Sequence, residues 1–219
     1  MFGRIASSYD KLNRIMTFRQ DLKWRKEAAR KLGSNPEAIY LDLGAGTGDT
    51  LLEVRRNSPG STVVGLDFTP EMIQLGRKRK DLRGALWVLA DAHHLPFPPC
   101  SFQGTMSAFL MRNLPQVDPV FKEQHRVLCT DGRLICLEAT PPQRSPLSYL
   151  VKLYMKYVIP FLGRLISRDS EAYTYLSISI AEFLDPDYLS QKIKAAGFRD
   201  VQFTRHMMGT IAIHQATKV

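Results

Sequence analysis

The chain has 219 residues and a formal net charge of +9, an ordinary composition for a soluble protein with one well-buried domain. Its longest nearly apolar stretch, Tyr157 to Gly163, is far below the roughly 20 residues that span a bilayer. The start, "MFGRIASSYDKL", lacks the apolar core of a secretory signal, so we expect a cytoplasmic protein whose cysteines, Cys100, Cys129 and Cys136, are free thiols.

Two helical segments are expected first, followed by strands and helices in alternation. "SSYDKLNRIMTF" and "QDLKWRKEAARKLG" have helical patterns, and Gly33 ends the second. Strands are then predicted over "AIYLDLG", "STVVGLDFT", "GALWVLAD", "FQGTMSAFL" and "GRLICLEAT", and helices over "DTLLEVRRNS", "PEMIQLGRKRK" and "DPVFKEQHRVLC". The helix that starts at Pro70 has Thr69 as a cap. This alternation predicts an α/β fold with a parallel sheet and helices on both faces.

The alternation breaks after Thr140. The stretch "PPQRSPLSYLVKLYMKYVIPFLGRLIS" has no strand pattern and is interpreted as an insertion before the sheet resumes. "DPDYLSQKIKAAGF" is typical of a helix that Gly197 ends. "RDVQFTRHMMGTIAIHQATK" predicts two strands around Met207–Gly209, a hairpin that can close the edge of the sheet.

The positive charge gathers in two stretches. Residues 1–31 carry nine Lys/Arg against three acids, and residues 143–168 carry five basic residues and no acid. In the second stretch the basic residues alternate with apolar and aromatic ones, as on an amphipathic surface. Two interpretations stay open, a solvated face and a surface that contacts an anionic membrane. Nucleic acid is the less favoured partner, because the chain has no aromatic-interleaved or base-methylation motif.

The stretch "LDLGAGTGD" places three glycines between a strand and a helix. Such a turn lets a ligand approach backbone amides at the carboxyl end of the strand. Acids end three successive strands, Asp42 before the turn, Asp67 in "GLDFT" and Asp91 in "VLADAHHLPF". Each acid alone could simply cap the next helix. Together they suit a nucleoside, because Asp67 can accept both ribose hydroxyls and Asp91 an adenine amine, while the Ala92 backbone binds the ring edge.

The acid ahead of the turn decides between cofactors. The spacing is G-x-G-x-G rather than the dinucleotide G-x-G-x-x-G, and a pyrophosphate would not favour the Asp42 carboxylate beside it. S-adenosylmethionine carries a sulfonium and an ammonium, which a carboxylate can stabilise. We therefore predict S-adenosylmethionine as the cofactor, and no metal site.

Motifs that run in order along nearly the whole chain are "MFGRIASSYDKLNRIMTF", "LDLGAGTGD", "GLDFTPEM", "ADAHHLPFP", "RNLPQVD", "HRVLCTDGRLICLE", "AYTYLSISI" and "GTIAIH". Together they resemble the ubiquinone/menaquinone C-methyltransferases, the UbiE/MenG-type branch of the class I S-adenosylmethionine-dependent enzymes. The chain departs from that pattern at 129–132, where Lys-Pro-Gly-Gly is usual, at Leu110, where glycine is usual, and at Thr140, where serine often stands. Leu110 can narrow the pocket, so the departures bear on the acceptor rather than on the cofactor.

The resemblance implies a Rossmann-like class I methyltransferase fold, with a mostly parallel seven-stranded sheet and a C-terminal antiparallel hairpin. The single domain is expected to comprise a helical lid (1–33), a cofactor-binding core (34–140), a helical insertion for acceptor or membrane (141–180) and a closing helix with the hairpin (181–219). The implied activity is C-methylation of a prenylated quinol, demethylmenaquinol or a ubiquinol precursor, in respiratory quinone biosynthesis. Expected partners are that quinol, an anionic membrane at its inner face (in the mitochondrial matrix of a eukaryote) and a second copy in a homodimer.

The predicted cofactor contacts are Tyr9, Asp42, Gly44, Gly46, Thr47, Gly48, Asp67, Phe68, Met72, Asp91, Ala92 and Ala108. Arg112 is predicted to orient the quinol oxygen and stabilise its anion, with Asn113 in support; a structural salt bridge is the alternative for Arg112. Arginine stays protonated and is a poor base. A water, His93 or His94 could accept the proton, although an exposed loop pair is the favoured interpretation of these histidines.

Two other functions stay open at this level. One is a methyltransferase acting on another small phenolic or lipid acceptor, which Leu110 and the altered turn at 129–132 favour. The other is a catalytically silent scaffold that binds the cofactor.

Overall fold

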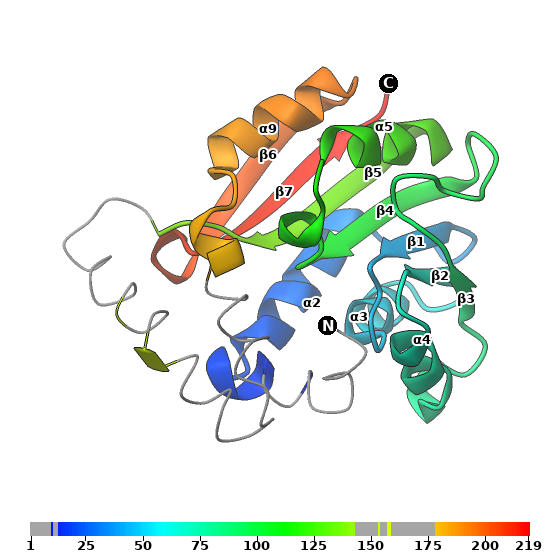
Figure 1. Ribbon diagram of the computed structural model, residues 1–219. Coiled ribbons are helices and arrows are strands. Elements are labelled where there is room, and N and C mark those ends of the chain that lie inside the picture. The colour runs from blue at the N-terminus through cyan, green and yellow to red at the C-terminus, as the bar shows by residue number, and fades with distance from the viewer. Residues whose placement is uncertain (1–9, 11–12, 143–152, 154–156, 159–177) are drawn as a thin grey trace.

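The computed structural model describes residues 10, 13–142, 153, 157–158 and 178–219, and Figure 1 draws the rest of the chain as a thin grey trace. Tyr9 and most of the predicted insertion at 141–180 lie outside the described residues. Among the residues described, no helix is both long and apolar enough to cross a bilayer.

A seven-stranded sheet with the order β3-β2-β1-β4-β5-β7-β6 forms the centre of the molecule (Figure 1). The strands are β1 (Ile39–Leu43), β2 (Thr62–Asp67), β3 (Leu86–Leu89), β4 (Phe102–Ala108), β5 (Leu128–Ala139), β6 (Arg199–His206) and β7 (Ile211–Thr217). The first five pair in parallel, and β7 runs antiparallel to both β5 and β6. The strand order reverses between β1 and β4, which is where open α/β sheets form ligand crevices. The predicted α/β fold with its C-terminal hairpin is confirmed.

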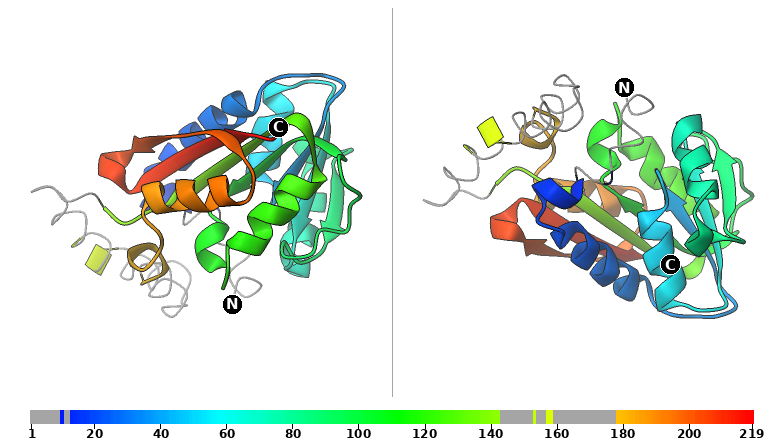
Figure 2. Two further views of the ribbon diagram at one scale, coloured as in Figure 1. Left: turned by 90° about the horizontal axis from the view of Figure 1, so that it is seen from above. Right: turned by 90° about the horizontal axis from the view of Figure 1, so that it is seen from below.

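Helices cover both faces of the sheet (Figure 2). The helices are α2 (Gln20–Leu32), α3 (Asp49–Asn57), α4 (Pro70–Arg77), α5 (Asp118–Val127) and α9 (Pro186–Ala195), with single 3-10 turns η1 (Lys80–Leu82), η2 (Met111–Asn113) and η4 (Met207–Gly209). Residues of α2 and α3 pack on one face, whereas α5 and α9 pack on the other.

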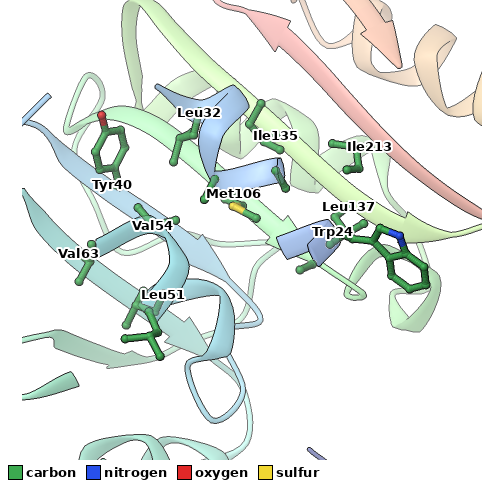
Figure 3. Packing of buried hydrophobic residues seen from close by; sticks show 14 of the residues in the cluster. Trp24, Leu32, Tyr40, Leu51, Val54, Val63, Met106, Ile135, Leu137 and Ile213 are labelled. Carbon is green, nitrogen blue, oxygen red and sulfur yellow. The ribbon is translucent and has the colours of Figure 1, made fainter. Parts of the chain in front are cut away.

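Alternate residues of each central strand enter opposite cores. Tyr40 of β1 and Ile135 of β5 belong to the same hydrophobic cluster as Trp24 of α2 (Figure 3), whereas Leu41 and Leu134, one residue away in each strand, pack on the other face. This period of two follows from strand geometry. The central strands are buried on both faces, so they are nearly all apolar and their few buried acids stand out.

β5 begins earlier than predicted, at Leu128 rather than at Gly132. Leu128 already pairs with Phe102 of β4, and the register then shifts before the regular pairing starts at Gly104 and Arg133. The polar residues of this irregular segment interrupt the apolar pattern, and for this reason the strand start was hidden in the sequence. The helix before it, α5, accordingly ends at Val127.

The expectation of three free thiols is wrong for two of the cysteines. Cys100 and Cys129 form a disulfide between the loop before β4 and the start of β5, and only Cys136 among them is free, buried in the core. The sequence hides this pairing because the two cysteines are 29 positions apart, and only the parallel pairing of β4 with β5 brings them together. Burial raises the pKa of the Cys136 thiol to about 12, so this thiol stays protonated.

Candidate active site

A cavity of about 660 Å³ opens at the carboxyl ends of β1, β2, β3 and β4. Ten of the residues predicted from the sequence line it: Gly44, Gly46, Thr47, Asp67, Phe68, Met72, Asp91, Ala92, Ala108 and Asn113. Its volume suits a nucleoside-sized ligand. The sheet therefore brings together residues that are spread over 70 positions of the chain, because parallel strands end at the same edge.

Asp67 organises the glycine turn at the floor of this cavity. One of its carboxylate oxygens accepts a hydrogen bond from the Gly46 amide at 2.8 Å, and the other accepts one from the Thr69 amide at 2.8 Å. Thr69 occupies the N-cap position of α4 as predicted, but its side chain makes no cap bond; the contact with Asp67 instead fixes the backbone just before the helix. A carboxylate oxygen has two lone pairs. Asp67 can therefore still accept ribose hydroxyls from the cavity.

The glycines of the turn differ in their surroundings. Gly46 has a φ of +56° and open space where a side chain would project, so ligand atoms can approach its backbone. Gly44 lies under Leu110, whose side chain would stand 2.8 Å from an added Cβ. Gly48 does not line the cavity; it is the N-cap residue of α3 and packs against Leu82 and Trp87.

Asp42 lies beneath the turn and is almost completely buried. Neither of its carboxyl oxygens makes a hydrogen bond of standard geometry within the described part of the chain. Burial raises the pKa of Asp42 to about 8, with Asp67 and Asp49 adding to the rise and Arg25 opposing it. Asp42 does not itself line the cavity, but it lies two residues before Gly44, which does, and its buried carboxyl can stabilise a cation bound above the turn.

Asp91 stands at the opposite end of the cavity floor, after β3. Its Oδ1 accepts a hydrogen bond from the His93 amide at 2.9 Å and lies 2.7 Å from His93 Nδ1. These hydrogen bonds hold the pKa of Asp91 below its ordinary value, so the carboxylate is ionised. His93 and His94 both line the cavity, and His93 Nε2 lies 3.1 Å from the Gln116 carbonyl oxygen.

Two further charged residues that line the cavity were not predicted, Arg25 of α2 and Asp49 of α3. Asp10, which belongs to the expected lid, also lines it and accepts a hydrogen bond from the Thr47 hydroxyl at 2.6 Å. Arg79 donates to Asp49 at 2.8 Å. Burial disfavours the Asp49 anion, but Arg25 and Arg79 outweigh it and lower the pKa of this carboxyl.

The two missed residues differ in the signal that could have found them. Asp49 follows the glycine turn directly, at the positive end of a helix, where an acid is favoured. Arg25 is one of nine basic residues before position 32, and nothing in the pattern of its helix separates it from its exposed neighbours.

Arg112 lies just beyond the cavity wall. Its guanidinium forms an ion pair with Glu138 of β5, and both side chains are buried, with 4% and 0% exposed. Arg112 lines a second cavity of about 510 Å³ between η2 and α9. Asn113 reaches the first cavity, and its side-chain amide donates to the Phe109 carbonyl at 3.0 Å.

The two cavities share one wall. Leu114, Pro115 and Gln116, the segment that follows η2, line both of them. A molecule in the second cavity would therefore lie one loop away from a ligand in the first, with Arg112 beside it.

The donor set fits S-adenosylmethionine. A nucleoside can be held by the carboxylates of Asp67 and Asp91 at the ends of β2 and β3, with the exposed ring of Phe68 beside them. The backbone around Gly46 lies at the other end of the floor, with the buried carboxyl of Asp42 beneath the turn, where a sulfonium and an ammonium need negative charge.

Solved structures share this fold. An S-adenosylmethionine-dependent methyltransferase from Thermotoga maritima, described as a possible histamine N-methyltransferase, aligns with a TM-score of 0.69 at 19% identity, covering 100% of this chain and 98% of that one. A phosphoethanolamine N-methyltransferase 2 from Haemonchus contortus, solved with S-adenosyl-L-methionine, aligns with a TM-score of 0.66 at 14% identity, covering 89% of this chain and 52% of that one. The fold is that of the class I S-adenosylmethionine-dependent methyltransferases.

The particular family follows from the sequence as a whole. The model of the ubiE/COQ5 methyltransferase family matches residues 1–218, and the chain belongs to this family. It is 39% identical to the ubiquinone/menaquinone biosynthesis C-methyltransferase UbiE of Desulfotalea psychrophila, over 100% of this chain and 89% of that protein. It is 40% identical to the demethylmenaquinone methyltransferase of Thermus thermophilus, over 98% of both. The resemblance drawn from the motifs is confirmed.

Proposed function

We propose that this methyltransferase transfers a methyl group to a ring carbon of a prenylated quinol of the demethylmenaquinol type. Enzymes named demethylmenaquinone methyltransferase are 40% and 36% identical to this chain over 98% and 100% of its length, which supports this acceptor. The observation that carries the chemistry is the set of acids at one edge of the sheet: Asp67 and Asp91 line the cavity, and Asp42 lies buried at the end of β1 beneath the glycine turn. S-adenosylmethionine, when bound, supplies an electrophilic methyl group on a sulfonium.

The protein's part in the reaction is to make the ring carbon nucleophilic and to hold it in line. With S-adenosylmethionine bound, the methyl group would pass from sulfur to the ring carbon and leave S-adenosylhomocysteine, and the ring carbon would then give its proton to a water. A quinol hydroxyl beside that carbon donates more electron density as its anion. Arg112 is proposed to stabilise this anion from the second cavity, and Asn113 to support its position.

Arg112 has a structural role as well, and a test must separate the two. Removing the guanidinium alone would leave Glu138 buried and uncompensated, at a cost of about 3–5 kcal/mol of stability. The pair Arg112→Met with Glu138→Gln removes both charges and keeps the side-chain volumes similar. We expect this double variant to fold and bind S-adenosylmethionine but to lose at least about 100-fold in turnover.

The assay uses labelled S-adenosylmethionine with demethylmenaquinol, a demethylated ubiquinol precursor and plain phenols, followed by mass spectrometry of the product. Methylation of a quinol ring carbon is expected. Transfer only to a phenolic oxygen would replace the proposed acceptor, and cofactor binding without any transfer would make the protein a scaffold. If the Arg112/Glu138 double variant turns over at the wild-type rate, Arg112 has only a structural role.

The membrane contact, the oligomeric state and the division of the chain belong to the same proposal. A prenyl tail partitions into the membrane, and the basic stretch 143–168, most of which lies outside the described residues, is proposed to contact anionic lipid there. The homodimer and the division of the chain at 33, 140 and 180 also stay proposals.

A further inference from the structure

His93 makes two polar contacts with its ring, and both are with oxygen atoms that can only accept. Nδ1 lies 2.7 Å from Oδ1 of Asp91, and Nε2 lies 3.1 Å from the carbonyl oxygen of Gln116. A neutral imidazole carries one N–H donor and one acceptor nitrogen. Only the imidazolium, with two N–H groups, can donate to both oxygens at once. In this arrangement His93 has no lone pair left to take a proton from a substrate.

The two contacts join parts of the cavity that are far apart in the sequence. Asp91 ends the β3 side of the floor, and Gln116 belongs to the wall that the two cavities share. The contact with His93 uses Oδ1 of Asp91, and the His93 amide donates to the same oxygen at 2.9 Å. This leaves the other oxygen of the carboxylate, Oδ2, for a ligand.

We propose that His93 is a positioning residue for the cofactor: as an imidazolium it ties the Asp91 carboxylate to the Gln116 carbonyl and holds the adenine end of the cavity against the shared wall. The inference rests on the proposed function, because it takes Asp91 as the acceptor for the adenine amine. When the ring loses a proton, a lone pair faces one of the two oxygens and that contact is lost. Cofactor affinity should then fall as the pH rises.

Three titratable side chains lie on or beside the loop that carries the ring, Asp91, Glu123 and His94. The Asp91 carboxylate, held ionised, is its direct partner. Glu123 of α5 accepts from the Leu95 amide at 2.8 Å on the same loop; Arg126 lowers its pKa and, as its ion-pair partner, offsets its negative charge. His94 is the remaining titratable neighbour, and it lines the same cavity.

The test compares cofactor affinity in the wild type and in His93→Gln across pH. Dissociation constants for S-adenosylmethionine are measured by calorimetry at pH 6, 7, 8 and 9. The titration of Asp42 affects both proteins and cancels in the ratio of their constants. We expect the variant to bind S-adenosylmethionine about tenfold more weakly than the wild type at pH 6, because one charge-assisted contact is lost. At pH 9 the ratio of the two dissociation constants should approach one. A ratio that does not change with pH would mean a merely structural role and would overturn the inference.

A matched control is His206→Gln, because His206 also faces a carboxylate, Glu27 at 3.3 Å, but does not line the cavity. The ratio of its dissociation constant to that of the wild type should stay near one from pH 6 to pH 9. The same pH trend as in His93→Gln would refute the inference. Nitrogen NMR of the wild type supplies a readout that needs no variant. At pH 6 both ring N–H protons of His93 should be held in hydrogen bonds and exchange slowly with solvent, and two rapidly exchanging N–H protons would contradict the proposal. If the folded wild type binds no S-adenosylmethionine, the proposed function fails, whereas the NMR result still decides the state of His93.

Discussion

Asp42 couples the protonation state of the protein to its cofactor. With a pKa raised to about 8 by burial, this carboxyl keeps its proton at neutral pH in the free protein. A bound sulfonium or ammonium favours the anion, so binding should release a proton. The affinity for S-adenosylmethionine should therefore rise with pH up to about 8, the opposite of the trend that His93 contributes.

The variant Asp42→Asn separates the effect of this carboxyl on stability from its effect on cofactor binding. Because the folded pKa lies above the ordinary value of 3.8, Asp42 contributes stability that is fully present below pH 3.8 and is lost as the pH rises towards about 8. The variant stays neutral, so we expect it to be more stable than the wild type at pH 8, by up to about 1.4 kcal/mol for each pH unit above 3.8, with the difference shrinking towards pH 4.5.

Urea unfolding at pH 4.5 and pH 8 measures this difference, and calorimetry in two buffers of unlike ionisation enthalpy measures the proton released on binding. The variant should bind S-adenosylmethionine at least about tenfold more weakly and release no proton. Equal stability differences at the two pH values would show that Asp42 does not titrate between them.

The residues of the cavity were predictable where the chain gives them a fixed place. Asp42, Asp67 and Asp91 each end a strand, and parallel strands end at one edge, so their meeting follows from the alternation alone. Arg25 reaches the same cavity from the middle of a helix, and only the packing of α2 against α3 decides which of its basic residues turns inward. The partnership of Arg112 with Glu138 depends on β4 and β5 being neighbours, which the order of the elements does not state.

At the scale of elements, the turn between β1 and α3 combines two tasks in one run of glycines. Gly46 faces open space in the cavity, whereas Gly48, with a φ of +93°, packs so closely that an added Cβ would stand 2.4 Å from Leu82 Cδ1. Gly46 therefore leaves room for the ligand, whereas Gly48 allows η1 and β3 to pack closely against the start of α3. The sequence pattern alone does not distinguish them.

Substituting each glycine by alanine should separate these tasks. Gly48→Ala strains a left-handed position and collides with Leu82 and Trp87, so we expect a loss of about 2–4 kcal/mol in the free energy of unfolding. Gly46→Ala also carries strain, of about 1 kcal/mol, but its methyl group enters the space that the ligand needs, so cofactor affinity should fall at least about tenfold. Thermal unfolding and calorimetry on both variants check this, and a Gly46→Ala protein that binds normally would move the ligand away from the turn.

The helices and strands themselves were predictable because their apolar residues recur at regular spacings. Strands buried on both faces and helices with one apolar stripe differ clearly in sequence, and every strand of the described sheet was expected. The start of β5 was not, because the bulge at 129–132 puts polar residues into a paired strand. Such an irregularity is decided by the neighbouring strand, and local pattern carries no sign of it.

At the scale of the whole molecule, the two ends of the sheet carry different tasks. The cavity and its acids lie at the carboxyl ends of the strands, while the Cys100–Cys129 disulfide joins the amino ends of β4 and β5. The central strands, whose side chains are packed on both faces, separate the two. Stability at the amino ends should therefore be adjustable without changing the cofactor site.

Replacing both cysteines by serine, or adding reductant, tests this separation. The disulfide closes a loop with a sequence separation of 29, so its loss should lower the free energy of unfolding by about 2–4 kcal/mol. The dissociation constant for S-adenosylmethionine should change less than about twofold, because no residue of the pair lines the cavity. Cys136→Ser is the control for a general effect of thiol removal, and it should not respond to the reductant differently from the wild type. An equal fall in stability and affinity on reduction would mean that the two ends of the sheet act as one unit and that β4 transmits the state of the disulfide to the turn at Ala108.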